Sequence, residues 1–313
     1  MKNLIFFTIV LSLLITLSSI SIAGSASVRK IDADGEPVAL AIDEEGGRLF
    51  SLNYLKNTLS VIDENQLKVV KTIALGKRIN RNVGGSALIY DASLNEIFIS
   101  TGGGEVLIFD GRSFELKGEI RIDRFIPDIA SDGYYLYLLD WSGNIHRYRG
   151  SREDWLVNFA ESGSPYMHLA KNKRIYLSSG SRGLLVIDSE KGEVLKKIEI
   201  NVLSAVASSS KHVFVAGPGK LYVIGAERVE VEKVISLDYG NYGGLGILYN
   251  RKNGYTYVVT EGNRVSIVDP QGSGRVVKKI DVCERPGSLA VNSKTGVVYV
   301  ACPSAKAINV LKE

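Results

Sequence analysis

The sequence contains few of the residues that build metal centres and disulfide frameworks. Its 313 residues include three histidines, two cysteines and two methionines. Clusters of several His or Cys ligands are therefore excluded, because zinc and related sites take three or four such side chains. The formal net charge is only +4, which disfavours proteins that bind nucleic acid through bulk positive charge. Phosphate-binding loops and GxSxG, HExxH and CxxCH motifs are also missing, which disfavours the reactions they support.

Long helical periodicity is missing as well. Beyond residue 27, short runs alternate apolar and polar residues and are separated by clusters of Gly, Asn, Asp and Ser. This pattern is typical of strands joined by turns. The 32 glycines and 15 tyrosines agree with it, because Gly supplies turns and aromatic side chains fill pleated faces. The composition therefore predicts an all-β protein.

The longest apolar run lies at the N-terminus. Lys2 is followed by apolar residues from Leu4 to Leu17, and small residues then lead to Ala23 and Ala26. A basic start, a short apolar run and a small-x-Ala site describe a secretory signal, and 14 residues are short for a bilayer span of about 20. We predict a signal peptide over residues 1–26, cleaved after Ala23 or Ala26, and an extracytoplasmic body with no membrane span. The alternative is an uncleaved N-terminal anchor.

The remaining chain is a repeat. One aromatic position recurs seven times at intervals of 38 to 48 residues, and a second apolar motif follows each aromatic by about ten residues. A third, lysine-rich run follows in most units. The aromatic residues are Phe50, Phe98, Tyr137, Tyr176, Phe214, Tyr257 and Tyr299. A period near 40 with several strands predicts a propeller blade, so seven aromatics predict seven blades in one domain over residues 27–313.

The two ends of the chain predict how the ring closes. The seventh repeat stops after its third strand, at residues 310–313. Residues 28–33 (VRKIDA) match residues 277–282 (VKKIDV), which belong to the fourth strand of the sixth repeat. The N-terminal segment should therefore supply the outer strand of the last blade and protect an otherwise open sheet. We predict a seven-bladed β-propeller of four-stranded antiparallel blades, closed in this way.

Two repeats carry a family resemblance. Residues 50–53 (FSLN) with 57–63 (NTLSVID), and residues 257–260 (YVVT) with 263–269 (NRVSIVD), resemble the YVTN-type β-propeller repeat. The resemblance covers the whole chain after the signal: it is equally strong in the seventh repeat, fair in the second and fourth, and weak in the third and fifth. It implies the propeller architecture shared with WD40-like repeats and an exported or surface location. It does not imply a reaction, although related propellers occur in redox enzymes.

The repeated residues have structural interpretations. The seven aromatics should pack between adjacent blades, since each buries a large area. Asp63, Asp110, Asp188 and Asp269 end the second motif and are followed by turn residues. Asx-turn hydrogen bonding explains them, and no site offers the closely spaced oxygen ligands that calcium needs. No metal or cofactor is predicted.

Candidate binding residues lie in loops that share one face of the propeller. These loops join the fourth strand of a blade to the next blade, and the second strand to the third, and we call this side the loop face. Rigid strands position such loops around the central channel, where propellers usually bind ligands. The candidates are Tyr54, Arg78, Arg81, Asn82, Trp141, Tyr166, His168, Arg182, Tyr239, Asn241, Tyr242 and Arg285.

Two of these loops are alike and differ from the others. Residues 82–90 (NVGGSALIY) match residues 241–249 (NYGGLGILY), whereas most other units carry Pro nearby. The Gly pair permits close approach of a ligand, or it forms a tight turn in place of Pro. Trp141, in a tight turn, is either an exposed interface anchor or folds over its own blade.

Histidine and cysteine give two further candidates. His168 falls on a strand near the channel and is the sole, weak catalytic candidate, because acid–base work needs a positioned partner that the sequence does not show. Cys283 lies in the loop that enters the last blade, and Cys302 ends the second strand of that blade, so both should lie toward the same face. In an exported protein they predict a disulfide that contributes about 3 kcal/mol, the alternative being two free thiols.

Three functions from different classes fit these features. The favoured one is an exported, non-catalytic propeller that binds a protein, peptide or cell-envelope component through its loop face. The second is an enzyme or redox or tetrapyrrole cofactor protein with its site in the channel, such as a lyase or oxidoreductase relative. The third is single-stranded nucleic-acid binding, which the low charge and the predicted location disfavour. It would use Arg78, Arg81, Tyr239, Tyr242 and Arg285.

Overall fold

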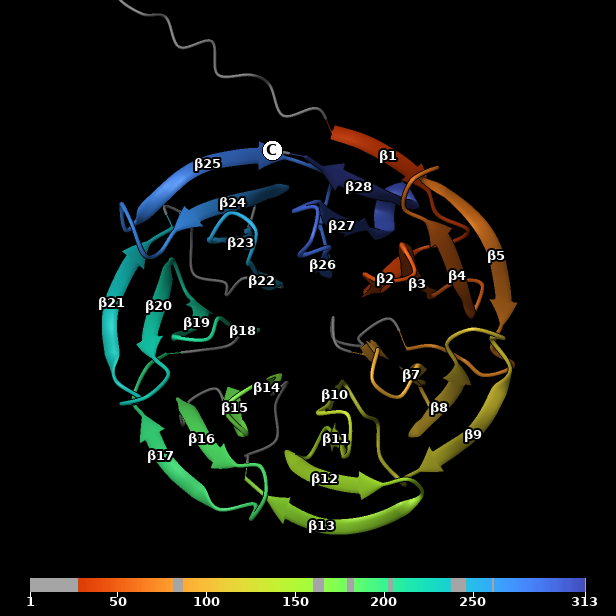
Figure 1. The fold of residues 1–313 in the computed structure, drawn as a ribbon, viewed down its shortest axis with the longest axis horizontal. Coiled ribbons are helices and arrows are strands. Elements are labelled where there is room, and N and C mark those ends of the chain that lie inside the picture. The colour runs from red at the N-terminus through yellow and green to blue at the C-terminus, as the bar shows by residue number, and fades with distance from the viewer. Residues whose placement is uncertain are drawn as a thin grey trace, which may run out of the picture.

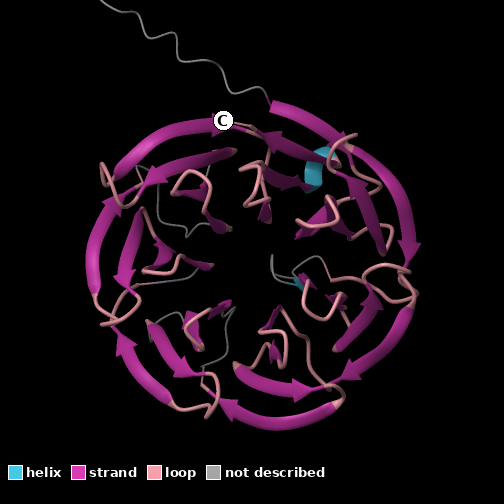
Figure 2. Cartoon of the chain, viewed as in Figure 1, coloured by secondary structure: helices cyan, strands magenta, loops and turns pink. Residues whose placement is uncertain are grey.

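The computed structural model describes residues 28–80, 87–159, 166–178, 183–201, 205–237, 246–260 and 262–312. In these ranges, 28 strands form seven four-stranded antiparallel sheets arranged in a ring (Figure 1). The predicted all-β, seven-bladed propeller is confirmed. Residues Pro303–Ala305 form a short 3₁₀ helix (Figure 2). No helix in the described ranges is long and apolar enough to cross a bilayer.

Each blade runs from an inner strand at the channel to an outer strand at the rim (Figure 1). The inner strands are β2 (Pro37–Asp43), β6 (Leu88–Asp91), β10 (Asp128–Ser131), β14 (Tyr166–Ala170), β18 (Val206–Ser208), β22 (Ile247–Asn250) and β26 (Leu289–Val291). The second strands are β3 (Arg48–Asn53), β7 (Glu96–Ser100), β11 (Leu136–Leu139), β15 (Arg174–Ser178), β19 (His212–Gly217), β23 (Tyr255–Thr260) and β27 (Val298–Cys302). We number the blades 1 to 7 in this order.

The third and fourth strands complete each blade. The third strands are β4 (Thr58–Asp63), β8 (Glu105–Asp110), β12 (Asn144–Arg149), β16 (Leu184–Asp188), β20 (Lys220–Gly225), β24 (Arg264–Asp269) and β28 (Ala307–Leu311). The outer strands are β5 (Lys68–Ala74), β9 (Leu116–Arg121), β13 (Arg152–Asn158), β17 (Val194–Ile198), β21 (Val231–Ser236), β25 (Arg275–Asp281) and, in blade 7, β1 (Val28–Asp32).

The ring closes as the sequence predicted. Strand β1 pairs antiparallel with β28, with Arg29 opposite Val310 and Lys30 opposite Asn309. The start of the described chain therefore completes the last blade. Lysine and arginine side chains on these outer strands also discourage pairing with another sheet edge.

The seven repeated aromatics are all buried, with no more than 3% of their surface exposed. They pack between blades, as predicted. The ring centroid of Phe50 in blade 1 lies 5.6 Å from that of Tyr90 in blade 2. Phe214 in blade 5 stacks 5.2 Å from Tyr249 in blade 6. Each aromatic therefore contributes to the core that joins its blade to the next.

The repeated aspartates form Asx turns, which confirms their structural interpretation. The Asp63 carboxylate accepts the backbone N–H groups of Asn65 (2.9 Å) and Gln66 (2.8 Å). Asp110 and Asp188 make equivalent bonds in blades 2 and 4. In blade 6 the Asp269 carboxylate accepts N–H groups one residue further along, those of Gly272 (2.8 Å) and Ser273 (2.7 Å). These bonds satisfy backbone donors in the turn between the third and fourth strands.

A cation from one blade reaches the turn of the next blade, a feature that the sequence did not reveal. The acceptor is the backbone carbonyl of the first residue after the third strand. The donor and acceptor pairs are Arg48 to Gly111 (2.7 Å), Arg147 to Ser189 (2.7 Å), Arg174 to Ala226 (2.6 Å) and Lys233 to Pro270 (3.2 Å). Because these donors are charged, each bond is stronger than a neutral one.

Candidate functional site

The turn after the second strand is tied to the loop that enters the same blade. In blade 3 the Trp141 N–H donates to the Phe125 carbonyl (2.9 Å), and in blade 1 the Tyr54 N–H donates to the Glu36 carbonyl (2.9 Å). In blade 7 the corresponding link is covalent. Cys302, at the end of β27, forms a disulfide with Cys283, with 5.9 Å between the Cα atoms. The turn after the second strand is therefore linked to the entering loop in all three blades, by a backbone hydrogen bond in blades 1 and 3 and by a disulfide in blade 7.

Trp141 lies in a groove on the loop face. Its side chain is 41% exposed, and its ring centroid lies 5.9 Å from that of Phe125. Asn80, Arg124, Phe125, Trp141 and Ser142 line this groove, which has a volume of about 410 Å³. The ring thus packs on the loop that enters its blade and still presents a face to solvent. We call these five residues the Trp141 groove.

Asp140 immediately precedes Trp141 and is bonded to the turn that carries it. It is completely buried, and its carboxylate accepts the N–H of Ser142 (2.8 Å), the N–H of Asn144 (2.9 Å) and the Asn144 side-chain amide (2.7 Å). The Arg124 guanidinium lies 3.8 Å from the same carboxylate and donates to the Ser142 hydroxyl. Asp140 therefore fixes the turn that carries Trp141 and attracts the Arg124 guanidinium to the edge of the groove.

His146, on β12, lies beneath this turn between two carboxylates. Its Nδ1 is 2.7 Å from Glu153 Oε1, and its Nε2 is 3.5 Å from Asp140 Oδ2. Burial lowers the pKa of His146, but hydrogen bonding and attraction to Asp140 and Glu153 outweigh burial and raise the pKa above its ordinary value. Burial raises the pKa of Asp140, but bonds from His146 and Asn144 outweigh it and lower the pKa.

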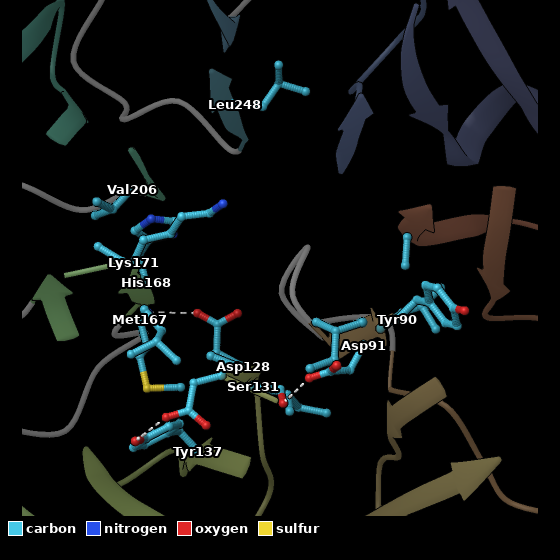
Figure 3. Close-up of a pocket in the computed structure, with 18 of the residues that line it drawn as sticks. Tyr90, Asp91, Asp128, Ser131, Tyr137, Met167, His168, Lys171, Val206 and Leu248 are labelled. Carbon is cyan, nitrogen blue, oxygen red and sulfur yellow. Dashed lines mark hydrogen bonds between the residues drawn. The ribbon is translucent and has the colours of Figure 1, made fainter. Parts of the chain in front are cut away.

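The central channel has two chemically different sides. The cavity is about 1380 Å³ and is lined by all seven inner strands. Polar side chains come from blades 2 to 4 and include Asp91, Asp128, Ser131, His168 and Lys171 (Figure 3). The lining from blades 1, 5, 6 and 7 is mainly apolar and includes Leu40, Val206, Leu248 and Leu289. A ligand in the channel would therefore meet one polar and one apolar wall.

His168 lines the channel and is hydrogen-bonded to a residue of the next blade. Among the described residues its hydrogen-bond partner is Ser208, whose hydroxyl oxygen lies 2.8 Å from His168 Nε2. Burial lowers the pKa of His168 to about 4, so the imidazole is neutral near pH 7. Within the described ranges, no group of three or more His, Cys, Asp or Glu side chains is placed to hold a metal ion.

The predicted site residues that the structure describes are not gathered at one point. Tyr166 and His168 line the channel. Tyr54 and Trp141 occupy equivalent turns of blades 1 and 3, and Arg78 and Arg285 are exposed on the loops that enter blades 2 and 7. The other candidates lie outside the described residues. They are Arg81, Asn82, Arg182, Tyr239, Asn241 and Tyr242.

Sequence reasoning missed Arg124, Phe125, Asp140 and His146. Phe125 carries no repeat signature, and His146 falls on a third strand, away from the channel. Aligning blade 3 on blade 1 was the available signal, because it sets Asp140 against Asn53 and His146 against Ser60. Blade 3 therefore has two ionisable side chains where blade 1 has two neutral polar ones, and this difference could have pointed to the site.

Comparison with solved structures supports the fold. The chain is similar to the β-propeller domain of Cps50 (Swd1) from Myceliophteria thermophila, with a TM-score of 0.75 and 11% sequence identity. The match covers 92% of this chain and 100% of that domain. No protein-family model and no curated protein matches the chain. The chain is a seven-bladed β-propeller.

Proposed function

We propose that this protein is an exported, non-catalytic propeller of the YVTN type that binds a protein, peptide or cell-envelope component through its loop face. The observation that carries the proposal is the Trp141 groove. It combines a partly exposed Trp ring on the turn after β11 with a second aromatic ring and an exposed guanidinium from the loop before β10. Trp and Arg are the side chains enriched at the energetic centres of protein interfaces.

Exposed apolar residues elsewhere support this choice of face. Most of the other large ones among the described residues lie singly on outer strands, such as Leu116 (56% exposed) on β9 and Val234 (50% exposed) on β21. Isolated exposed residues of this kind are normal on protein surfaces. Trp141 differs because it stands in a groove beside a charged group. Export is supported by the predicted signal in residues 1–26 and fits the disulfide, since such bonds persist in oxidising compartments.

A capture experiment tests the proposal. The full chain carries a C-terminal affinity tag, and its partners are recovered from the cell-envelope fraction after mild crosslinking. We expect Trp141→Ala to lose most of the captured partner, because truncating an interface anchor costs about 2 kcal/mol or more. The matched control is Leu116→Ala, an even more exposed apolar residue on the outer strand β9.

Two outcomes would overturn the proposal. Identical partners for wild type and Trp141→Ala would show that the groove is not the binding site. Finding the tagged chain only in the cytoplasmic fraction would remove the export step.

A further inference from the structure

A buried polar pair lies beneath the loop-face turn in three blades. In blade 1 the Asn53 amide donates to the Ser60 hydroxyl (2.8 Å), and in blade 6 the hydroxyls of Thr260 and Ser266 are 3.4 Å apart. The pair in blade 3 is Asp140 and His146. The strand registers agree, since Ser60, His146 and Ser266 each lie opposite the residue that follows the repeated aromatic. Blade 3 therefore carries an ionisable version of a neutral pair.

The side of blade 3 that carries His146 meets blade 2 in an apolar cluster, in which Leu138 and Tyr148 join Val106 and Ile120. On its own strand Tyr148 lies on the same side, and on the paired strands Leu138 and Leu156 lie opposite. The facing charges are Asp140 from the turn and Glu153 from β13, with Arg124 beyond Asp140. Two cations, Arg124 and protonated His146, thus share the single buried carboxylate of Asp140.

When His146 loses its proton, the attraction between Arg124 and Asp140 becomes stronger. A neutral imidazole keeps one N–H and gains one lone pair, so it can donate to only one of the two carboxylates. Glu153 has 40% of its side chain exposed and can turn to water, whereas Asp140 is fully buried. In either tautomer Asp140 loses a neighbouring positive charge. Burying a carboxylate without a counter-ion costs free energy. Asp140 therefore pairs with the Arg124 guanidinium when His146 is neutral.

Arg124 is also the charged group of the Trp141 groove. Its side chain is 58% exposed, and its guanidinium is 3.8 Å from Asp140, longer than a hydrogen bond. When His146 neutralises Asp140, Arg124 is available to a ligand. A guanidinium beside two aromatic rings suits a carboxylate next to an apolar side chain, because the planar fork binds carboxylates in bidentate fashion.

We propose that the Trp141 groove binds a peptide segment in which a carboxylate adjoins an apolar side chain, and that protonated His146 frees Arg124 to bind that carboxylate. Binding is tighter at low pH and weakens as His146 loses its proton. His146 is a positioning residue, since it acts through Asp140 and Arg124. This proposal rests on the proposed function and specifies the ligand and the regulation of the same site.

Peptide pools test the ligand chemistry. The probe is an unlabelled pool of acetylated hexapeptides, Gly-Gly-X-Glu-Gly-Gly amide with X as Leu, Phe or Tyr, and the matched pool carries Gln in place of Glu. Binding is measured by isothermal titration calorimetry from about pH 5.5 to about pH 8.5, the range in which His titrates. We expect the Glu pool to bind more tightly, and to weaken with rising pH by at most about tenfold per unit, the limit for one proton.

Two variants and one control test the role of His146. Asp140→Asn with His146→Ser copies the neutral pair of blade 1 and should bind the Glu pool at every pH with a flat profile. His146→Gln should also give a flat profile but weak binding throughout, because charged Asp140 then keeps Arg124. The control is His212→Gln, because His212 also contacts a carboxylate, that of Glu232 at 3.2 Å, but lies in blade 5. Its pH profile should match that of wild type.

A readout without ligand separates this proposal from the proposed function. In a Trp155→Phe background, Trp141 is the remaining tryptophan, since the chain has two. Its emission should shift with pH, and the shift should vanish in His146→Gln. The proposal is overturned if neither pool binds, if both pools bind equally, or if the pH dependence survives in His146→Gln. Envelope capture that depends on Trp141 but not on pH would leave the proposed function standing alone.

Discussion

Blades 1 and 3 are built on the same frame with different polar chemistry. In both, a backbone N–H after the second strand donates to the entering loop, and a polar pair is buried below it. Blade 1 uses the neutral residues Asn53, Thr58 and Ser60, whereas blade 3 uses Asp140, Asn144 and His146. The frame comes from the repeat, and the ionisable groups occur where an exposed aromatic residue and a cation also meet. Departure from the repeat, rather than agreement with it, marks the candidate site.

The largest expected effect separates the two polar pairs. Asp140→Ala should lower the free energy of unfolding by about 3–5 kcal/mol, because it leaves buried cationic and amide donors without their acceptor. Asn53→Ala should cost about 1–3 kcal/mol, the usual loss for a neutral buried group. Urea unfolding near pH 6 measures both. Equal losses would show that the charge in blade 3 adds nothing to the shared frame.

The second effect concerns blade 7, where a disulfide replaces the hydrogen-bonded link. Removing Cys283 and Cys302 together, as a double Ala variant, should cost about 3 kcal/mol, because the bond closes a loop with a sequence separation of 19. Reduction of the wild-type protein should give a similar loss. The measurement is thermal unfolding with and without reductant. A wild type insensitive to reductant would contradict the prediction.

The smallest effect contrasts the two buried histidines. His168 has its pKa lowered from the ordinary 6.5 to about 4, so between these values the unfolded chain binds a proton that the native chain does not. The free energy of unfolding therefore falls as the pH is lowered through this window. His168→Asn should reduce that fall by about 1–3 kcal/mol. His146, with a raised pKa, loses its stabilising effect as the pH rises, so His146→Gln should not reproduce the result.

The fold was predictable because each blade repeats a local pattern. The seven aromatics, the aspartate turns and the match between residues 28–33 and 277–282 each determined a feature that the structure confirms. These features depend on contacts within a blade or between neighbouring blades, which the repeat places in a fixed register.

The candidate site was less predictable because it joins residues from different loops. Trp141 was identified by its place in a tight turn, but Arg124 and Phe125 come from the loop before β10, and their contact with Trp141 depends on backbone geometry. The inter-blade bonds from Arg48, Arg147 and Arg174 were missed for the same reason. Each joins a side chain to a backbone carbonyl, a group that every residue possesses.

The pairing of β1 with β28 determines how the ring could be held in place. Val28 lies opposite Leu311, so both ends of the described chain emerge together from the rim (Figure 1). A tether attached at either end would hold the propeller at its outer edge and leave the two openings of the channel uncovered. A fusion partner attached there would stay clear of the Trp141 groove, whereas one inserted into the turn at Ser142 would cover it.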